Sequence, residues 1–400
     1  MSTSSQGAAP RLGRLMAMSI LVVAASAVGV MLLGAGIGDI GPDLEIGPGE
    51  IGILTAAFFT AAAITSSRAG RIVERIGWQR AVRINAVLIG LILLSIASLV
   101  DSPWTLGAAL ALMGATYSLA NPAANQALAD HVHPSRRGSF FGLKHAGIPT
   151  ATLLAGAAVP LIILNFGWRA AYGCAAVMAF AIVLFVPRGE VPATAEHHDE
   201  DPRRTVEPLP TTTLRKLAVA GTLATIGVVG LSTYLVASLV EDGFSDGAAG
   251  WLQFGGALFS VLARVSYGVL TDRTGTRGFA AVSALYGVGA FIYLSWIPAS
   301  GTALALLVIV AYATAWGWPG LYTYSVVNAN TATAAASSGV SQAGIFTGAA
   351  LGPLVVGQII ERASFDASWA FIAGCLLAAS FVMASVNRTV VARPSRTSNR

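Results

Sequence analysis

The sequence predicts an all-α membrane protein in which twelve transmembrane helices form two six-helix bundles related by a parallel repeat. Three observations predict this fold. The 400 residues are 55% hydrophobic and only 11% charged, and their mean hydropathy is +0.69. Apolar stretches of about 20 residues, long enough to cross roughly 30 Å of hydrocarbon as a helix, recur along the chain. Residues of the first half also recur in the second half at a nearly constant spacing.

The apolar stretches set the number of spans. A chain this apolar has too few polar residues to cover a water-exposed surface, which excludes a soluble protein. The stretches are also too long for the strands of a membrane barrel, which have about ten alternating residues each. We place the twelve spans at 15–37, 50–68, 80–100, 104–125, 139–164, 169–187, 214–240, 248–270, 279–298, 302–326, 338–360 and 366–387.

The distribution of basic residues predicts the orientation, because Lys and Arg are retained on the cytoplasmic side. With the N-terminus inside, cytoplasmic segments hold twenty of the 24 Lys and Arg residues. The external loops hold two, Arg169 and Arg362, and the last two, Lys144 and Arg264, lie within spans. We expect a multi-pass protein of the plasma (inner) membrane with cytoplasmic N- and C-termini. Topology and the lipid bilayer account for the basic balance, so we expect no nucleic acid partner.

The internal repeat predicts the domain boundaries. Gly70 and Gly268 are 198 residues apart, and Pro122 and Pro319 are 197 apart. The segment between the copies is rich in Pro and charge and has no apolar periodicity, as expected of a flexible linker. We therefore expect a first bundle at 1–187, a cytoplasmic linker at 188–213 and a second bundle at 214–400. The linker segment HHDED, 197–201, could bind a metal ion, but we interpret it as solvated and assign no metal site.

A charged loop motif occurs twice at the repeat spacing. The segment GVLTDRTGTR, 268–277, and its counterpart beginning at Gly70 resemble the loop signature of the major facilitator superfamily between spans two and three and between spans eight and nine. In the first copy Glu74 replaces the usual Asp, and Trp78 and Gln79 replace two basic residues. The residues assigned to this cytoplasmic gate motif are Gly70, Glu74, Arg75, Gly77, Gly268, Asp272, Arg273, Gly275 and Arg277.

The position of the motif suggests its role. Gly77 and Gly275 can take the positive φ that a short turn needs. Glu74 and Asp272 can then face the positive N-terminal ends of helices in the opposite half, near Ser337 and near Ser139. The resemblance implies a secondary active transporter that moves a small solute by alternating access at a midplane site, and we interpret the motif as its cytoplasmic latch. A solvated loop is the alternative interpretation.

Polar residues inside the spans are the candidates for solute binding, because ionisable residues are costly in a membrane. Lys144 and Arg264 come from different halves, and the repeat partners of Lys144 and His145 are Ser341 and Gln342. The alternative is that both cations reach the cytoplasmic interface along their flexible side chains. Prolines inside spans are expected to loosen the helices, at Pro122, Pro149, Pro160, Pro319 and Pro353. The predicted solute-binding residues are Lys144, His145, Arg264, Gln342, Asn121, Asn125 and Tyr322.

Three functions are compatible with these residues. No Asp or Glu lies in the interior of a predicted span, so the cavity is expected to be cationic and the solute an organic or inorganic anion. Proton coupling through Lys144, or alternatively through His145, is considered. The second hypothesis is an efflux pump for amphipathic compounds or drugs, and the third is a non-transporting receptor or sensor. The sequence has no nucleotide loop, metal-ligand cluster or nucleophile with a base, so we expect no enzyme activity, catalytic residue or cofactor. A monomer is expected.

Overall fold

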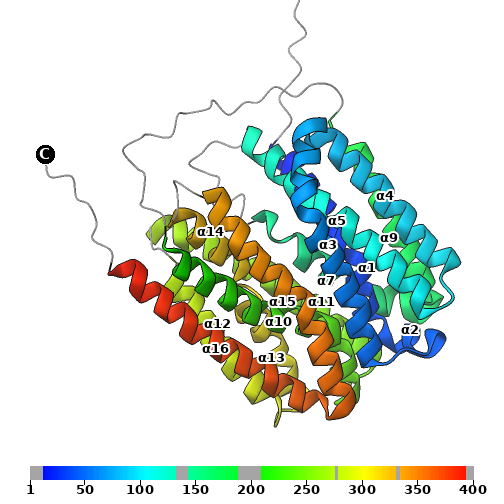
Figure 1. Cartoon of the computed structure of the whole chain (residues 1–400). Coiled ribbons are helices and arrows are strands. Elements are labelled where there is room, and N and C mark those ends of the chain that lie inside the picture. The colour runs from blue at the N-terminus through cyan, green and yellow to red at the C-terminus, as the bar shows by residue number, and fades with distance from the viewer. Residues whose placement is uncertain (1–11, 132–142, 188–208, 275–277, 330–333, 393–400) are drawn as a thin grey trace, which may run out of the picture.

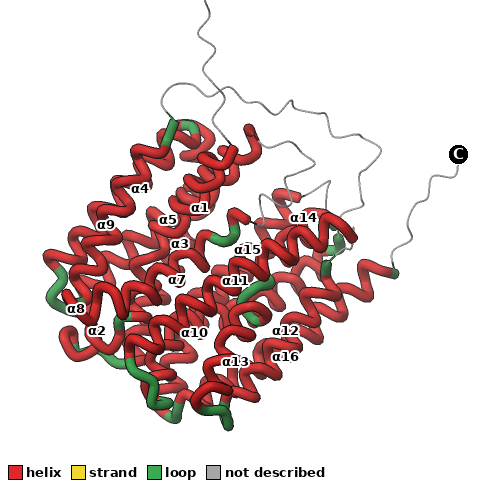
Figure 2. The backbone as a smooth tube through the Cα atoms, turned by 180° about the vertical axis from the view of Figure 1, so that it is seen from behind, coloured by secondary structure: helices red, strands yellow, loops and turns green. Residues whose placement is uncertain are grey.

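The computed structural model describes residues 12–131, 143–187, 209–274, 278–329 and 334–392. All regular structure in these ranges is helical (Figure 2). Eleven helices of the described ranges are long and apolar enough to cross a membrane. Helix α5, whose sequence carries Asn121, Asn125 and Gln126, occupies the place of the remaining predicted span. The prediction of an all-α membrane protein is confirmed.

The first bundle contains α1 to α9 and the second contains α10 to α16 (Figure 1). The first is built from α1 (Leu12–Ala35), α2 (Ile37–Leu44), α3 (Pro48–Ile76), α4 (Trp78–Leu99), α5 (Pro103–His131), α7 (Gly147–Ala158), the π-helical turn η2 (Val159–Ile163), α8 (Leu164–Phe166) and α9 (Trp168–Phe185). The second is built from α10 (Thr211–Glu241), α11 (Asp246–Thr274), α12 (Phe279–Trp296), α13 (Gly301–Thr314), α14 (Pro319–Asn328), α15 (Ala334–Arg362) and α16 (Phe365–Val391).

Local chemistry fixes several helix ends. Pro48 occupies the first position of α3, where its missing N–H would have no helical partner. The Glu50 carboxylate accepts a hydrogen bond from the Gly47 N–H at 2.9 Å, which caps the same end. Gly77 separates α3 from α4 with a φ of 79°, and Gly167 separates α8 from α9 with a φ of 80°. These positive φ values favour glycine and allow the chain to reverse direction over one residue between consecutive helices.

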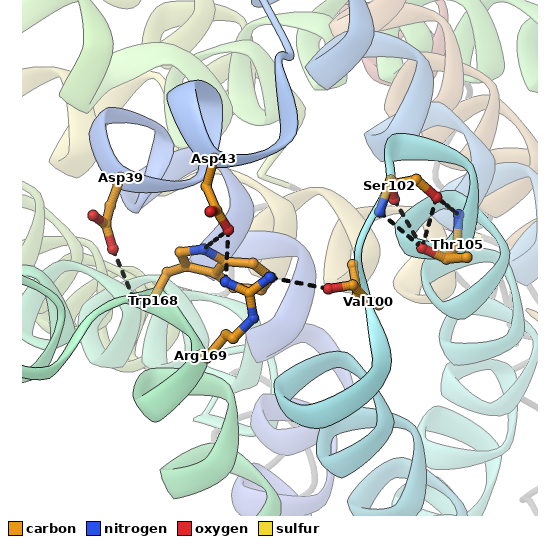
Figure 3. Close-up of polar contacts among 7 residues, drawn as sticks. All are labelled: Asp39, Asp43, Val100, Ser102, Thr105, Trp168 and Arg169. Atoms are coloured by element: carbon orange, nitrogen blue, oxygen red, sulfur yellow. Dashed lines mark hydrogen bonds and ion pairs between the residues drawn. The ribbon is translucent and has the colours of Figure 1, made fainter.

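Helix α2 was not predicted from the sequence, and it holds the loops at its end of the first bundle together (Figure 3). The Asp39 carboxylate accepts from the backbone N–H of Trp168 at 2.8 Å, at the start of α9. The Asp43 carboxylate accepts from the Trp168 indole at 3.0 Å and from the Arg169 guanidinium at 2.6 Å. Arg169 also donates to the Val100 carbonyl at 3.1 Å. Loops after α1, α4 and α8 are thereby joined.

The two bundles meet through α1, α3 and α7 of the first and α10, α11 and α15 of the second. We call the end of the molecule that holds α2 the α2 end, and the end that holds Gly77 the Gly77 end. In Figures 1 and 2 the bundles lie close together near the α2 end and diverge toward the Gly77 end. The Tyr234 hydroxyl of α10 lies 2.9 Å from the Pro48 carbonyl oxygen and 2.8 Å from that of Pro353, linking the bundles at the α2 end.

Two glycine crossings at the α2 end follow the internal repeat. A Cβ atom on Gly52 of α3 would collide with the Pro353 carbonyl oxygen of α15. A Cβ atom on Gly250 of α11 would lie 2.7 Å from the Gly156 carbonyl oxygen of α7. Gly52 and Gly250 are repeat partners, and so are Gly156 and Pro353. The same close backbone contact therefore closes both pseudo-equivalent helix pairs, since only glycine leaves room for it.

Candidate functional site

A cavity of about 100 Å³ lies between the two bundles. In the first bundle its walls come from α1, α3, α5, residues 144–145 before α7 and the start of α7. In the second they come from α10, α11, α14, α15 and the turn before α14. The lining residues are Val23, Met31, Phe59, Tyr117, Asn121, Lys144, His145, Ile148, Thr225, Val228, Val229, Ser232, Arg264, Trp316, Trp318, Pro319, Thr323, Gln342, Ile345, Phe346 and Ala349.

Lys144 is a helical residue just before the turn 145–146 that leads into α7, and it lines the cavity. Its side chain is 3% exposed. The ammonium nitrogen donates a hydrogen bond to the Asn125 side-chain oxygen at 2.7 Å. A lysine that extended along its helix to the interface would keep its ammonium group in water. The buried position therefore argues against the interfacial alternative for Lys144.

Arg264 of α11 is 5% exposed and lines the same cavity. Its Nη1 donates to the His145 carbonyl at 2.7 Å, and its Nη2 donates to the Trp316 carbonyl at 2.6 Å. The guanidinium carbon lies 5.3 Å from the centre of the Trp316 ring, within the range of a cation–π contact. Its Nε is buried and has no hydrogen-bond partner among the described residues. Arg264 thus links the two bundles, and its Nε–H stays unpaired within the described residues.

The sequence explains why one of these carbonyls is available. In a continuous helix the carbonyl of His145 would accept from the N–H four residues later. That residue is Pro149, which has no N–H, and it occupies the first turn of α7, where proline is tolerated. The His145 carbonyl therefore needs another donor, and Arg264 supplies it. The Trp316 carbonyl lies in the four-residue turn 315–318 between α13 and α14.

The site carries positive charge without a compensating carboxylate. No Asp or Glu is among the lining residues of the described chain. Within the same ranges neither Lys144 nor Arg264 forms an ion pair. Buried charges are normally paired with an opposite charge, because leaving water is costly. Here the partners are neutral oxygens, so the cavity remains attractive to an anion.

Only some of the other predicted binding residues line the cavity. His145, Gln342 and Asn121 line the cavity. Asn125 is not a lining residue and contributes through its bond to Lys144. Tyr322 does not line the cavity either, which differs from the prediction. Its hydroxyl donates to the Leu217 carbonyl at 2.9 Å inside the second bundle, because a buried phenol needs an acceptor.

Several lining residues were not predicted from the sequence. Tyr117 lies one helical turn before Asn121, and the Asn121 amide donates to its hydroxyl at 3.2 Å. Phe346 lies one turn after Gln342. Residues four apart lie on the same face of a helix, so both could have been identified from the predicted residues Asn121 and Gln342. Thr225 and Ser232 of α10 have no such neighbour among the predicted residues.

The loop motif is described only in part. Gly77 has the positive φ that the predicted turn requires. Gly70, Glu74 and Arg75 lie in the last turns of α3, and the Glu74 side chain is exposed. In the second copy Gly268, Asp272 and Arg273 lie on α11. Gly275 and Arg277 fall outside the described residues, as do Ser139, the predicted partner region of Asp272, and the linker segment 197–201.

Comparison with known proteins agrees with this architecture. A family model described as Major Facilitator Superfamily matches residues 19–340. The uncharacterized transporter YycB of Bacillus subtilis (strain 168) is 26% identical over 372 residues, covering 89% of this chain and 88% of the relative.

Solved structures share the fold at low sequence identity. A bacterial homologue of the human lysosomal transporter Spinster, in an inward-facing and occupied conformation, has a TM-score of 0.77 at 14% identity, covering 98% of this chain and 100% of that chain. A mutant of the nucleoside transporter NupG has a TM-score of 0.69 at 15% identity, covering 93% of this chain and 98% of that chain. The chain therefore belongs to the Major Facilitator Superfamily and is a membrane transporter of that family, as its repeat and loop motifs predicted.

Proposed function

We propose that this protein moves a small organic or inorganic anion across the plasma membrane by alternating access. The observation that carries the proposal is the pair of buried cations, Lys144 and Arg264, in a cavity between the bundles whose described lining has no carboxylate. Because the two cations come from different bundles, a bound anion contacts both moving parts of the transporter. Lys144 and His145 are the candidates for coupling transport to protons.

The proposed orientation places both termini and the linker in the cytoplasm and the α2 end outside. The bundles meet closely at the α2 end, through Tyr234 and the two glycine crossings. In this orientation the described conformation is closed to the outside. A His197→Cys variant lacking the two native cysteines, Cys174 and Cys375, tests the orientation. An impermeant thiol reagent is expected to label it only after the cells are opened, and labelling of intact cells would refute the orientation.

An efflux pump for amphipathic compounds is the second candidate. The rings of Phe59, Trp318 and Phe346 in the cavity wall favour it. Drug-sized ligands, however, occupy pockets of about 300–1,000 Å³, and this cavity measures about 100 Å³. The volume therefore favours a small solute. A protein without solute-dependent flux would instead be the receptor or sensor considered above.

Uptake into proteoliposomes tests the proposal. A panel of labelled anions is measured with and without a pH gradient, and protein-free liposomes correct for passive leak. Lys144→Gln and Arg264→Gln are each expected to weaken binding of the best anion by roughly tenfold or more, since a charge-assisted hydrogen bond contributes about 1.5–3 kcal/mol. Arg264→Lys should restore binding only partly, because an ammonium group cannot replace the planar guanidinium.

Two exposed cations provide matched controls. Lys216→Gln on α10 and Arg362→Gln on α15 remove the same charges from exposed positions. Neither substitution is expected to change the affinity for the anion. Unchanged affinity in both Lys144→Gln and Arg264→Gln would end the anion proposal and make efflux the leading candidate.

A further inference from the structure

The positive charge of the cavity is gathered on one side. Lys144 and His145 are neighbours in the sequence, and Arg264 donates a hydrogen bond to the carbonyl of His145. The three basic residues are therefore grouped around one short segment of chain. Among them the Nε–H of Arg264 is buried and unpartnered within the described residues. The charge of this guanidinium is therefore not fully compensated by hydrogen bonds beside the cavity, which favours an anion there.

Most of the remaining cavity wall is apolar. It includes Phe59 of α3, Ile148 of α7, Val229 of α10, and Trp318 and Phe346 of the second bundle. If an inorganic anion were bound to the basic residues, this apolar wall would remain in contact with water. An anion with a hydrocarbon body would cover it, and each buried methylene group strengthens binding about fourfold by the hydrophobic effect.

The volume limits the length of that body. A protein cavity of about 150 Å³ accommodates benzene, which has six carbon atoms. The present cavity of about 100 Å³ is smaller. A second carboxylate on the ligand would lie away from Lys144 and Arg264 and would have only neutral polar groups such as Asn121 as partners, which is unfavourable for a buried charge. These features together select one charged end and a short apolar remainder.

We propose that the transported anion is a short-chain monocarboxylate of about two to four carbon atoms. The carboxylate binds beside Arg264 and Lys144, and the hydrocarbon part contacts Phe59 and Phe346. This inference depends on the proposed anion transport. It adds the chemical class of the solute and the division of the cavity into a charged part and an apolar part.

Equilibrium binding by calorimetry on the purified full chain tests the inference, because undissociated short acids leak through liposomes. The probes are formate, acetate, propionate, butyrate, octanoate, succinate, chloride and nitrate, with butyramide as the neutral analogue of butyrate. Affinity is expected to rise about fourfold per methylene group from acetate to butyrate and to fall for octanoate. Succinate, the inorganic ions and butyramide should bind at least tenfold more weakly than butyrate.

Substitutions separate the two parts of the cavity. Phe346→Ala is expected to flatten the dependence on chain length while leaving acetate nearly unchanged. Arg264→Gln should weaken all the carboxylates by a similar factor. Phe381→Ala, on a ring that is 76% exposed on α16, is the matched control and should change neither.

The outcomes distinguish this inference from the proposed function. Equal binding of nitrate and butyrate, or a flat series from acetate to butyrate, would overturn the monocarboxylate inference and leave anion transport standing. Tight binding of butyramide would favour a neutral amphipathic solute and contradict both. Absence of binding and of uptake for every anion in the panel would also contradict both.

Discussion

The substitution Pro149→Ala tests how the backbone positions the guanidinium of Arg264. Proline at this position leaves the His145 carbonyl without its helical donor, and Arg264 donates to that carbonyl at 2.7 Å. Alanine would add an N–H in the first turn of α7. The new N–H would compete for the same carbonyl and release one of the two backbone acceptors that fix the guanidinium.

The contacts of Arg264 set the size of the effect. A hydrogen bond to a charged group contributes about 1.5–3 kcal/mol, which corresponds to roughly a tenfold to 150-fold change in an equilibrium constant. Arg264 keeps its bond to the Trp316 carbonyl at 2.6 Å, so its displacement is partial. We therefore expect anion affinity to fall by about tenfold, the lower end of that range.

A double-mutant cycle measures whether Pro149 acts through Arg264. Affinity for the best anion is compared in the unmutated protein, Pro149→Ala, Arg264→Gln and the double variant. If the proline acts through the guanidinium, it should have little effect once Arg264 is replaced. Pro122→Ala, which adds an N–H within α5, is the control. A loss of affinity of equal size in both backgrounds would show that Pro149 acts through general helix structure and would refute the positioning role.

Three further predictions concern the ends of the molecule. Gly52→Ala should disfavour the conformation that is closed at the α2 end, because its Cβ collides with a backbone carbonyl. Spin-label distances across this end should increase. Gly374→Ala on α16, at a position open to added atoms, should leave them unchanged. If the motif is the proposed latch, Asp272→Asn should favour opening of the Gly77 end and slow transport, with Glu74→Gln milder. Each would lose the proposed interaction with a helix N-terminus, which contributes about 0.3–2 kcal/mol. Unchanged accessibility and rate would exclude the latch. The pKa of Asp43 is lowered first by its hydrogen bond from the Arg169 guanidinium and then by that from the Trp168 indole. Its contribution to stability is therefore present above the pKa of a free aspartate and is lost as the pH falls through the lowered value. The protection of the α2 amides relative to their intrinsic exchange rate at each pH should fall in acid in the unmutated protein but not in Asp43→Asn.

The sequence predicted the spans well because hydrophobicity in a membrane protein depends mainly on local composition. It did not predict α2, which follows the first span directly. The carboxylates of Asp39 and Asp43 in this helix contact residues 129 and 125 positions away, respectively, at the start of α9. Contacts of that separation leave no local pattern, so the residues between the first two spans read as a loop.

The effect of a proline on its span could not be predicted from the local sequence either. Five prolines within spans were expected to loosen their helices. Pro149 lies in the first turn of α7, just after the turn 145–146; Pro160 lies in a π-helical turn; and Pro319 begins α14 after a break between helices. At Pro122 and Pro353 the helices α5 and α15 continue without interruption. The missing N–H is the same in each case, so neighbouring helices decide whether the chain bends.

The candidate site shows why polar residues could be selected from the sequence but their contacts could not. Lys144 and Arg264 stood out because each is a charge within an apolar span, yet the rotation of each helix decides between cavity and interface. The acceptors of Arg264 are backbone carbonyls, which every residue carries, so no residue type marks them. Pro149 is the exception, since the absence of its N–H identifies one carbonyl that must find a donor elsewhere. Pro149 follows His145 by four residues and lies in the first half of the repeat, whereas the buried Arg264 lies in the second half. Pro149 therefore indicates one contact of this site that the polar residues around it do not.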